Sequence, residues 1–224
     1  MDFEEWEPIY ERILQDFGFD RGDDVRARDV LAGYVEPFDL DRLPLDGKTV
    51  AIAGGSPTLS EHLDTVHDAD VVIASSTAAD VLLEANALID LMVTDLDGCP
   101  ETAIALSRAG VPVAVHAHGD NVNSLRRYLP GFDVSNVLGT TQSAPVYGVE
   151  NFGGFTDGDR GAFLADHLGA TRLVFPGWDF DDTTVSRSKR RKLAWAERLL
   201  LLLERRRGER FELLEGRRDR IRSL

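Results

Sequence analysis

The chain has 224 residues, of which 43% are hydrophobic, and this is enough to bury the core of one α/β domain. Acidic residues outnumber basic ones by 39 to 25, and the net charge of −14 argues against nonspecific binding of nucleic acid by the whole surface. The single cysteine, Cys99, excludes an internal disulfide and a cysteine-based zinc cluster. The N-terminus is acidic, unlike a signal peptide, and no apolar run reaches the ~18 residues of a membrane span. We therefore expect a cytoplasmic protein with a small-molecule partner.

Charge is distributed unevenly along the chain. Arginine supplies 22 of the basic residues and lysine only 3, while Asp outnumbers Glu by 25 to 14. This composition predicts a protein adapted to high salt, in which the repulsion between acidic surface groups is screened at molar ionic strength. From Arg187 to the end, 14 residues are basic and 6 are acidic. This basic end is either a helix that docks on the acidic body or a surface that binds phosphate.

The first part of the chain predicts a helical cap followed by a linker. Apolar residues recur at three and four spacings over residues 3–17, and Gly18 ends that helix. A second helix is expected over residues 23–31, and residues 35–47 indicate a linker. The expected domains are the N-terminal cap and linker over 1–47, an α/β catalytic domain over 48–186, and a basic C-terminal helical region over 187–224 packed on it.

From residue 48 onward, short apolar runs alternate with helical patterns. The expected strands are 49–53, 71–74, 91–93, 111–115, 136–141 and 172–175. One helix is expected to start within residues 59–63, and others are expected over 78–88, 100–108, 124–129, 158–168 and 189–207. This alternation predicts a mostly parallel, Rossmann-like sheet flanked by helices. Because ligands bind beyond the carboxyl ends of parallel strands, we expect the polar residues at those ends to converge on one site.

The strand at 91–93 is followed by two carboxylates, Asp95 and Asp97, and then by Gly98. If residues 94–97 stay extended, both carboxylates point to the same side while Leu96 turns toward the core. Such oxygen ligands suit Mg²⁺, which also binds substrate phosphates. A solvated Asp-x-Asp-Gly turn is the alternative interpretation.

Two other strand ends carry small or hydroxyl residues. Gly54 and Gly55 lack the spacing of a dinucleotide fingerprint, and no Walker-type lysine follows them, so an ordinary P-loop kinase or dehydrogenase is excluded. Their backbone N–H groups can still approach a phosphate or a base. Ser75, Ser76 and Thr77 offer hydroxyl groups to a ligand or a cap to the next helix.

The fourth strand ends in a more specific polar group. His116 and His118 share one face of an extended segment, and Asp120 and Asn121 follow. Two histidines can bind zinc, but the surrounding groups are hard oxygens, so we favour hydrogen-bonding roles, with one histidine pairing with a phosphate. Two buried, satisfied histidines are the alternative interpretation.

Further candidates follow in the last third of the chain. Arg160 lies in the first turn of a helix capped by Thr156 or Asp157, where a cation is unfavourable unless it contacts an anion. Trp178 stands beside a second Asp-x-Asp motif, where an aromatic ring either stacks on a flat heterocycle or covers the core. Two of the three lysines, Lys189 and Lys192, are three residues apart on one helix face. They suit the neutralisation of nucleotide phosphates.

Five motifs in this order resemble those of the archaeal 6-hydroxymethyl-7,8-dihydropterin pyrophosphokinase family. They are 94–98 (TDLDG), 116–121 (HAHGDN), 154–160 (GFTDGDR), 177–180 (GWDF) and 189–193 (KRRKL). The resemblance spans nearly all of the chain, and it extends distantly to the catalytic domain of thiamine pyrophosphokinase. It implies a Mg²⁺-dependent transfer of diphosphate from ATP to the pterin hydroxymethyl group, which releases AMP, in folate or methanopterin synthesis.

The resemblance implies that Asp95 and Asp97 hold Mg²⁺ and that Asp120, Asp157, Asp159 and Asp179 are candidates for metal or substrate contacts. The residue patterns and the resemblance together give the following sets. The catalytic set would comprise Asp95, Asp97, Asp120, Arg160, Lys189 and Lys192. The substrate-binding set would comprise Gly54, Gly55, Ser75, Ser76, Thr77, His116, His118, Asn121, Phe155, Thr156, Asp157, Asp159, Trp178 and Asp179.

Several alternatives stay open on the sequence alone. A thiamine pyrophosphokinase-like enzyme would use the same donor chemistry on another acceptor. A nucleotide-sugar glycosyltransferase would use the same aspartate pair, and a non-catalytic nucleotide-binding protein would bind ATP without releasing AMP. We expect ATP and a small pterin as partners, with neither nucleic acid nor membrane, and a homodimer as an open alternative to a monomer.

Overall fold

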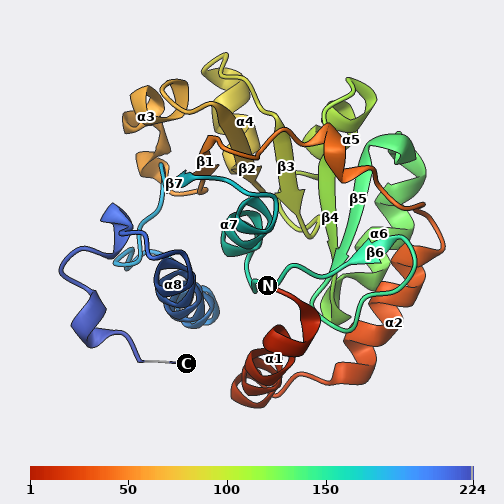
Figure 1. The fold of residues 1–224 in the computed structure, drawn as a ribbon. Coiled ribbons are helices and arrows are strands. Elements are labelled where there is room, and N and C mark those ends of the chain that lie inside the picture. Colours follow the sequence, from red (N-terminus) through yellow and green to blue (C-terminus); the bar gives the residue numbers. More distant parts are fainter. Residues whose placement is uncertain (223) are drawn as a thin grey trace. The chain divides into compact units, whose positions relative to one another are not determined.

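The chain folds into two units, each built from parallel strands and helices (Figure 1). The computed structural model describes residues 1–222 and 224. Unit 1 comprises Met1–Leu43 and Ile89–Gly153, and unit 2 comprises Pro44–Leu88 and Gly154–Leu224. Both units therefore combine segments that are far apart in the sequence.

Unit 1 contains the N-terminal helices and four strands in the order β6-β5-β4-β3. Its main elements are α1 (Phe3–Phe17), α2 (Arg21–Ala32), β3 (Leu91–Thr94), α5 (Pro100–Arg108), β4 (Val113–Ala117), α6 (Val122–Tyr128), β5 (Val137–Thr141) and β6 (Val149–Glu150). Short 3-10 turns lie at Leu40–Arg42, Gly119–Asn121, Leu129–Gly131 and Val134–Asn136. All three strand pairings are parallel, and α2 packs on β4 and β5.

Unit 2 contains three strands in the order β2-β1-β7 and the C-terminal helix. Its main elements are β1 (Thr49–Ala53), α3 (Leu63–His67), β2 (Val71–Ser75), α4 (Ala78–Glu84), α7 (Asp157–His167), β7 (Arg172–Val174) and α8 (Arg187–Arg207). Short 3-10 turns lie at Pro57–Glu61, Glu212–Leu214 and Arg218–Arg220. Both strand pairings are parallel, α7 packs on β1 and β2, and α8 packs on α7.

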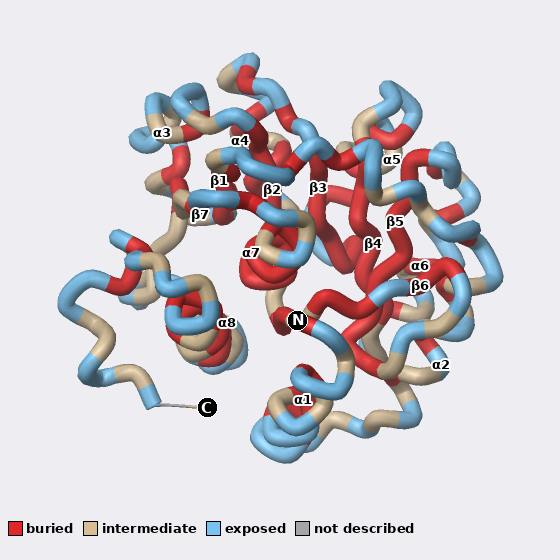
Figure 2. Tube along the Cα trace, in the orientation of Figure 1, coloured by how far each residue is buried: buried red, intermediate tan, exposed pale blue. Residues whose placement is uncertain are grey.

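Parallel strands that alternate with helices confirm the predicted α/β class, with one helix at the N-terminus and another near the C-terminus. In Figure 2 the strands β1 to β5 are almost entirely buried. Continuous apolar runs, rather than alternating ones, are the pattern expected for parallel strands covered on both sides.

Several predicted boundaries were wrong for local reasons. Helix α2 begins two residues before residue 23, because the Asp20 side chain accepts a hydrogen bond from Gly22 N (2.8 Å) and caps the helix there. Strand β4 begins at Val113 rather than at residue 111, because Val111 N donates to the Leu106 carbonyl at the end of α5. Strand β6 was not predicted.

The helix expected to start within residues 59–63 begins at Leu63 as the short helix α3, and a 3-10 turn at Pro57–Glu61 precedes it. Helix α4 ends at Glu84 rather than at residue 88. Within the part of the chain that the structure describes, no helix has both the length and the apolar character needed to cross a membrane. The division into cap, catalytic domain and basic C-terminal region stays a prediction, as does the cytoplasmic location.

Candidate active site

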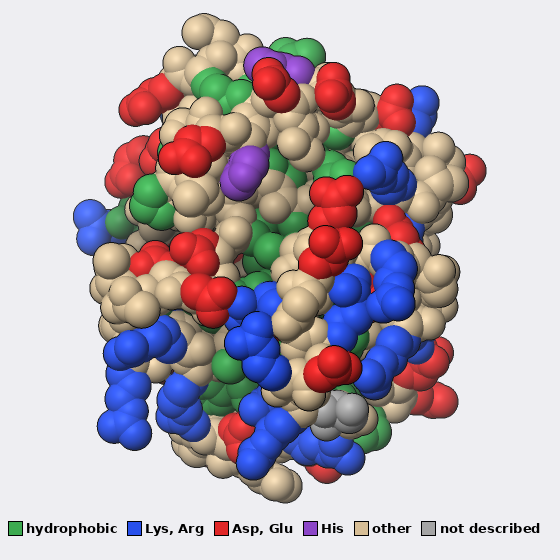
Figure 3. All heavy atoms as spheres, turned by 90° about the vertical axis from the view of Figure 1, so that its left-hand side faces the viewer, with side chains coloured by type: hydrophobic (Ala, Val, Ile, Leu, Met, Phe, Trp, Pro, Cys, Tyr) green, Lys and Arg blue, Asp and Glu red, His purple; other side chains and the backbone are tan. Residues whose placement is uncertain are grey.

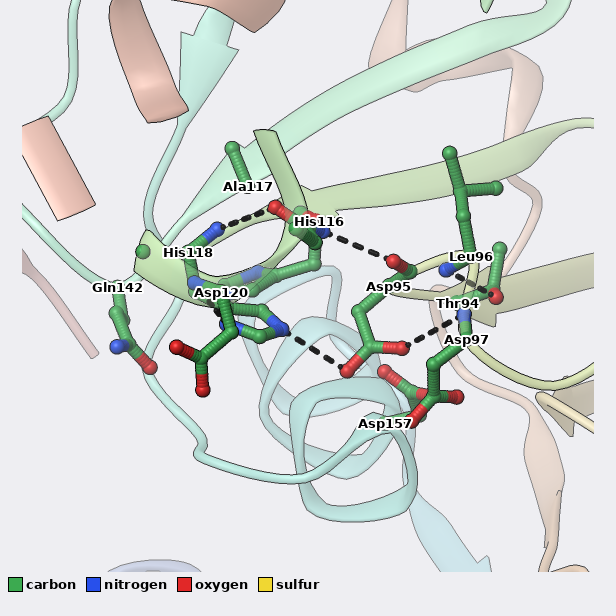
Figure 4. A network of polar contacts seen from close by, with 12 residues as sticks. Thr94, Asp95, Leu96, Asp97, His116, Ala117, His118, Asp120, Gln142 and Asp157 are labelled. Atoms are coloured by element: carbon green, nitrogen blue, oxygen red, sulfur yellow. Dashed lines mark hydrogen bonds and ion pairs between the residues drawn. The ribbon is translucent and has the colours of Figure 1, made fainter. Parts of the chain in front are cut away.

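The segment that follows β3 forms a tight turn (Figure 4). Leu96 has a φ of 68°, in the left-handed region, and its side chain is buried. Leu96 N donates to Thr94 Oγ1 (2.9 Å), and Asp97 N donates to Asp95 Oδ1 (3.3 Å). Residues 94–97 therefore do not stay extended, because these two side chains accept hydrogen bonds from backbone groups ahead of them, but Leu96 does turn toward the core as expected. A left-handed conformation costs a non-glycine residue about 1–2 kcal/mol, and such strain often occurs at functional sites.

The turn nevertheless keeps the two carboxylates together. Asp95 and Asp97 each offer an oxygen atom, and these atoms lie within 4.8 Å of each other. Asp95 is only 8% exposed, whereas Asp97 is exposed to solvent. A pair of hard oxygen donors, one buried and one open to water, fits the coordination preference of Mg²⁺, which keeps several water ligands.

His118 orients the buried carboxylate. Its Nε2 lies 3.1 Å from Asp95 Oδ2, and both side chains are mostly buried. The backbone N–H of Asp120 donates to His118 Nδ1 (3.4 Å), so Nδ1 acts as an acceptor and Nε2 carries the proton that is donated to Asp95. Hydrogen bonds of this kind fix carboxylates that bind metals. The Asp120 side chain itself is exposed.

Asn121 connects the ends of β3 and β4. Its Nδ2 donates to the Asp95 carbonyl (2.9 Å) and to the His116 carbonyl (2.7 Å), while its Oδ1 accepts from His118 N (3.1 Å). The side chain is buried, and these backbone contacts use both of its polar atoms. The geometry therefore favours a role for Asn121 in holding the loop rather than in touching substrate.

His116 lies within the sheet of unit 1. The residue is 2% exposed, and its Nδ1 lies 3.0 Å from Thr140 Oγ1 on the neighbouring strand β5. The ring centroids of His116 and His118 are 6.3 Å apart. His118 bonds to Asp95 Oδ2, whereas His116 lies beside Thr140 within the sheet, so the two histidines of one motif have different surroundings.

In unit 2 the glycines after β1 meet close neighbours. A Cβ atom at Gly54 would lie 2.5 Å from the Gly177 carbonyl oxygen, and one at Gly55 would lie 2.7 Å from Thr77 Oγ1. Packing against backbone therefore requires a glycine at position 54, whereas at position 55 the close neighbour is a side-chain hydroxyl. At the end of β2, Ser75 Oγ is buried and has no hydrogen-bond partner among the described atoms, and Ser76 has a left-handed φ of 48°.

Trp178 is wedged between two backbone segments of unit 2. Its Nε1 donates to the Ile52 carbonyl (2.9 Å). A Cβ atom at Gly158 would lie 2.3 Å from Trp178 Cζ2, and one at Gly54 would lie 2.8 Å from Cδ1. This packing favours the interpretation of Trp178 as a cover of the core, and stacking on a heterocycle stays a prediction.

The N-terminus of α7 carries several of the predicted residues. Thr156 is the N-cap, and the Asp159 carboxylate accepts from Phe155 N (3.1 Å), Thr156 N (2.6 Å) and Thr156 Oγ1 (2.5 Å). Asp159 is fully buried, and this burial raises its pKa above the ordinary value, against the opposing effect of its hydrogen bonds and of Arg160. Asp159 therefore completes a capping box.

Arg160 and Asp157 form a mostly buried ion pair with an N–O distance of 2.9 Å. Another nitrogen of this guanidinium, Nε, is buried and has no hydrogen-bond partner among the described atoms. Phe155, immediately before the cap, is also buried, and Asp179 accepts from Asp181 N (2.8 Å) in the loop after β7. The contact of Arg160 with the anion of a ligand stays a prediction. Its guanidinium already has one carboxylate partner, Asp157.

The basic end of the chain has two different parts. In the first turns of α8, Lys189 is exposed and Lys192 is partly exposed, and no acidic residue lies in the first turn. Further along, arginines pair with acidic residues of the same unit: Arg207 with Asp166 (2.8 Å), Arg217 with Glu197 (2.5 Å) and with Asp181, and Arg218 with Glu204 (2.6 Å). Figure 3 shows Arg and Lys side chains gathered over part of the surface.

The structure also reveals a residue that sequence analysis missed. Asp24 lies on α2 and is 2% exposed, on the same buried stripe as Ala27 and Leu31. A carboxylate at such a position needs polar partners. The signal in the sequence is an acidic residue at an apolar position of the helical period, although this position also lies in the first turn of the helix expected over residues 23–31, where acidic residues are common.

Comparisons with known proteins point to one family. Residues 34–185 match the family model described as 6-hydroxymethylpterin diphosphokinase MptE-like. The chain is 41% identical to the 6-hydroxymethyl-7,8-dihydropterin pyrophosphokinase of Methanothermobacter thermautotrophicus, over 92% of this chain and 96% of that protein. Proteins of the same name from Methanocaldococcus jannaschii and Pyrococcus furiosus are 37% and 39% identical, over 80% and 89% of this chain and 80% and 93% of their own lengths.

Proposed function

The chain belongs to the MptE-like family of 6-hydroxymethylpterin diphosphokinases, and on this premise we propose that it transfers diphosphate from ATP to 6-hydroxymethyl-7,8-dihydropterin. The pterin hydroxymethyl oxygen forms a bond to the β-phosphorus of ATP. The bond from that phosphorus to the α,β-bridging oxygen breaks, AMP leaves with this oxygen, and the hydroxyl proton passes to solvent or to a carboxylate. The product is the pterin diphosphate, for use in folate or methanopterin synthesis.

The observation that carries this proposal is the carboxylate pair at the end of β3. Asp95 and Asp97 offer hard oxygen atoms within 4.8 Å of each other, and His118 holds Asp95 through Oδ2. These residues fit Mg²⁺ better than zinc, because His118 donates a proton to the carboxylate instead of offering a lone pair. Bound there, Mg²⁺ would neutralise charge on the triphosphate.

Three cations are candidates for further neutralisation of the triphosphate. Lys189 and Lys192 lie near the start of α8, and Arg160 lies near the start of α7. Positive charge placed where negative charge develops is usually the largest contribution to phosphoryl transfer. Since Arg160 is already paired with Asp157, we expect the exposed Lys189 to respond most to the removal of its charge.

The remaining candidates divide by their surroundings. Asn121, Asp159 and Trp178 have their polar atoms engaged by the protein and support the local backbone. Ser75 is different, because its buried hydroxyl has no hydrogen-bond partner among the described atoms. We propose that Ser75 binds a polar edge of one of the two substrates. Asp120, Asp157 and Asp179 are further candidates for substrate contacts, and individual substitutions would test them.

The direct test is AMP release from ATP and Mg²⁺ at high KCl, with and without 6-hydroxymethyl-7,8-dihydropterin, and with thiamine as a parallel acceptor. We expect AMP only when the pterin is present. AMP release with thiamine but not with the pterin would identify thiamine as the acceptor. ATP binding without AMP in protein shown to be folded would favour a nucleotide-binding protein, and sugar transfer from a nucleotide sugar would favour a glycosyltransferase.

Substitution of the aspartate pair tests the metal assignment. We expect Asp95→Asn and Asp97→Asn each to lower turnover about 100-fold, because each change removes a charged oxygen ligand. Asp68→Asn, at an exposed position after α3, is the matched control and should keep wild-type turnover. If both strand-end variants turn over at a near-normal rate, the aspartate pair does not hold a catalytic metal.

A further inference from the structure

The two N-terminal helices reach the loops that follow β4 and β5 in unit 1. Trp6 Nε1 on α1 donates to the Gln142 carbonyl (2.9 Å), and Arg28 Nη1 on α2 donates to the Ala144 carbonyl (2.9 Å). Both helices lie outside residues 34–185, the part that matches the family model. Contacts from these helices, which the family model does not cover, therefore reach the loop at the carboxyl end of β5.

Asp24 makes the most concentrated of these contacts. Its Oδ1 accepts from Gly119 N (2.7 Å), and its Oδ2 accepts from both Tyr10 Oη (2.6 Å) and Gln142 Nε2 (2.8 Å). One buried carboxylate thus joins α1, α2, the loop after β4 and the loop after β5. Burial and the hydrogen bond to Asp24 raise the pKa of Tyr10 far above its ordinary value, so its hydroxyl stays a donor.

The loop after β4 fits closely against α2 at this point. A Cβ atom at Gly119 would lie only 2.7 Å from Asp23 Cβ and 3.5 Å from Asp24 Oδ1. The absence of a side chain allows Gly119 N to reach the carboxylate. Since Gly119 follows His118 directly, the Asp24 hydrogen bond acts one peptide away from the imidazole that contacts Asp95 Oδ2.

We propose that Asp24 is a positioning residue that holds His118 toward Asp95 through the backbone of Gly119. The carboxylate does not touch substrate, and its role is to fix the loop from which the imidazole reaches the aspartate. This inference rests on the proposed function for its effect on catalysis, because the aspartate pair is the proposed Mg²⁺ site. It extends that site to the N-terminal helices.

The two oxygens of Asp24 allow the positioning role to be separated from general stabilisation. Tyr10→Phe removes one hydrogen bond to Oδ2 and leaves the bond from Gly119 to Oδ1, so it is the matched control. Asp24→Ala removes both oxygens. Asp24→Asn keeps an acceptor for Gly119 N and is the conservative variant. Gly119→Ala disturbs the same loop through its collision with Asp23 and leaves the carboxylate in place.

The first measurement uses Mn²⁺ as a spectroscopic probe of the metal site, by electron paramagnetic resonance on full-length protein without substrate. We expect Asp24→Ala and Gly119→Ala to raise the Mn²⁺ dissociation constant about 10-fold or more, the usual effect of losing an outer hydrogen-bond support. Tyr10→Phe should stay within about 2-fold, and Asp24→Asn should recover most of the affinity. Asp95→Asn, which should abolish binding, shows that the signal reports this site.

The second measurement needs no metal. Nitrogen-15 NMR of the imidazoles, with His118→Gln to assign the signal, reports which ring nitrogen of His118 carries the proton. We expect the Nε2–H form in wild type and in Tyr10→Phe, and a mixture of the two neutral forms in Asp24→Ala and Gly119→Ala. If wild type fails to bind Mn²⁺ or to release AMP, the proposed function fails, and this measurement still decides the role of Asp24.

Two results would overturn the inference. One is a folded Asp24→Ala protein that keeps the wild-type His118 spectrum and Mn²⁺ affinity. The other is a loss of affinity in Tyr10→Phe equal to that in Asp24→Ala, which would make Asp24 a stabilising residue only. If Asp24→Ala does not fold, Gly119→Ala decides, and a wild-type His118 spectrum and Mn²⁺ affinity in folded Gly119→Ala protein would overturn the inference.

Discussion

Replacing Gly158 with alanine tests whether Trp178 is held by packing. Gly158 lies in the first turn of α7, and an added Cβ atom would lie 2.3 Å from Trp178 Cζ2 and 2.6 Å from Cη2. Carbon atoms normally approach to about 3.5 Å, so the ring must move by about 1 Å. The ring has little freedom to do so, because its Cδ1 and Nε1 atoms lie close to Gly54 and Nε1 is bonded to the Ile52 carbonyl.

The cost can be estimated from its parts. Overpacking a well-filled site costs about 1–3 kcal/mol, and loss of the indole hydrogen bond adds about 1 kcal/mol. Replacing glycine by alanine in a helix returns about 0.5–1 kcal/mol. We therefore expect Gly158→Ala to lower the free energy of unfolding by about 1–3 kcal/mol, which is a 5-fold to 150-fold change in the folding equilibrium.

The assay is chemical unfolding at fixed KCl, followed by tryptophan fluorescence. Gly22→Ala, in the first turn of α2, is the matched control, because the nearest atom to its added Cβ is Asp20 Oδ1 at 3.3 Å. We expect that control to stay within about 0.5 kcal/mol of wild type. Wild-type stability and unchanged fluorescence in Gly158→Ala would refute the reasoning and would leave Trp178 free to move toward a ligand.

Three further predictions concern the ionic contacts of the chain. Arg218→Ala should lower the free energy of unfolding by about 2–4 kcal/mol, because it leaves the buried Glu204 without its paired cation. Arg220→Ala is the control, and it should have little effect because it removes one hydrogen bond to a carbonyl. Burial alone would raise the pKa of Glu204, but the bonds from Arg218 and from Phe211 N hold that pKa below its ordinary value. The stability from Glu204 is therefore present above the ordinary carboxyl pKa and lost as pH falls through the lowered one. Wild type and Arg218→Ala should converge on acidification, and a gap in unfolding free energy that is constant with pH would contradict this. Unfolding free energy should also rise from low to multimolar KCl, as screening weakens the repulsion of a net charge of −14, and maximal stability at low salt would count against a halophilic origin.

The elements that depend on local sequence signals were predicted well. Helix α1 has the predicted bounds, and Gly18 ends it in a left-handed conformation with a φ of 72°. Strand β1 also has the predicted bounds, since an apolar run followed by two glycines has few alternatives. Periodicity and caps act within one turn or strand, and for this reason a single sequence is enough to recognise them.

Elements that depend on competition between neighbouring signals were predicted less well. The apolar run from residue 111 belongs in part to the end of α5, because Val111 N bonds to the Leu106 carbonyl before the strand begins. The strand β6 forms only where Gly148 adopts a φ of 76° and Val146 pairs with Val149. Neither outcome can be predicted from hydropathy, because both depend on which backbone groups form hydrogen bonds with each other.

The candidate site was predicted in its residue types but not in its supports. The aspartate pair and His118 were identified from their positions after two strands, and the structure gives a hydrogen bond between His118 and Asp95. Asp24 acts on the same loop from a position 95 residues earlier, through a bond to Gly119 N. No local pattern encodes such a contact, and only its burial on an apolar helix face distinguishes Asp24 from an ordinary first-turn acid.

The turn at Leu96 shows how this site is held before any ligand binds. A leucine in the left-handed region is unfavourable by itself, so the surrounding bonds must impose it. The backbone on either side is fixed by the Thr94 hydroxyl and by Asn121, and the buried leucine side chain anchors the turn in the core. Because the position of Asp95 is determined by these groups rather than by a ligand, its carboxylate needs little reorganisation when charge arrives. Such preorganisation is the condition under which a fixed charge contributes most to catalysis.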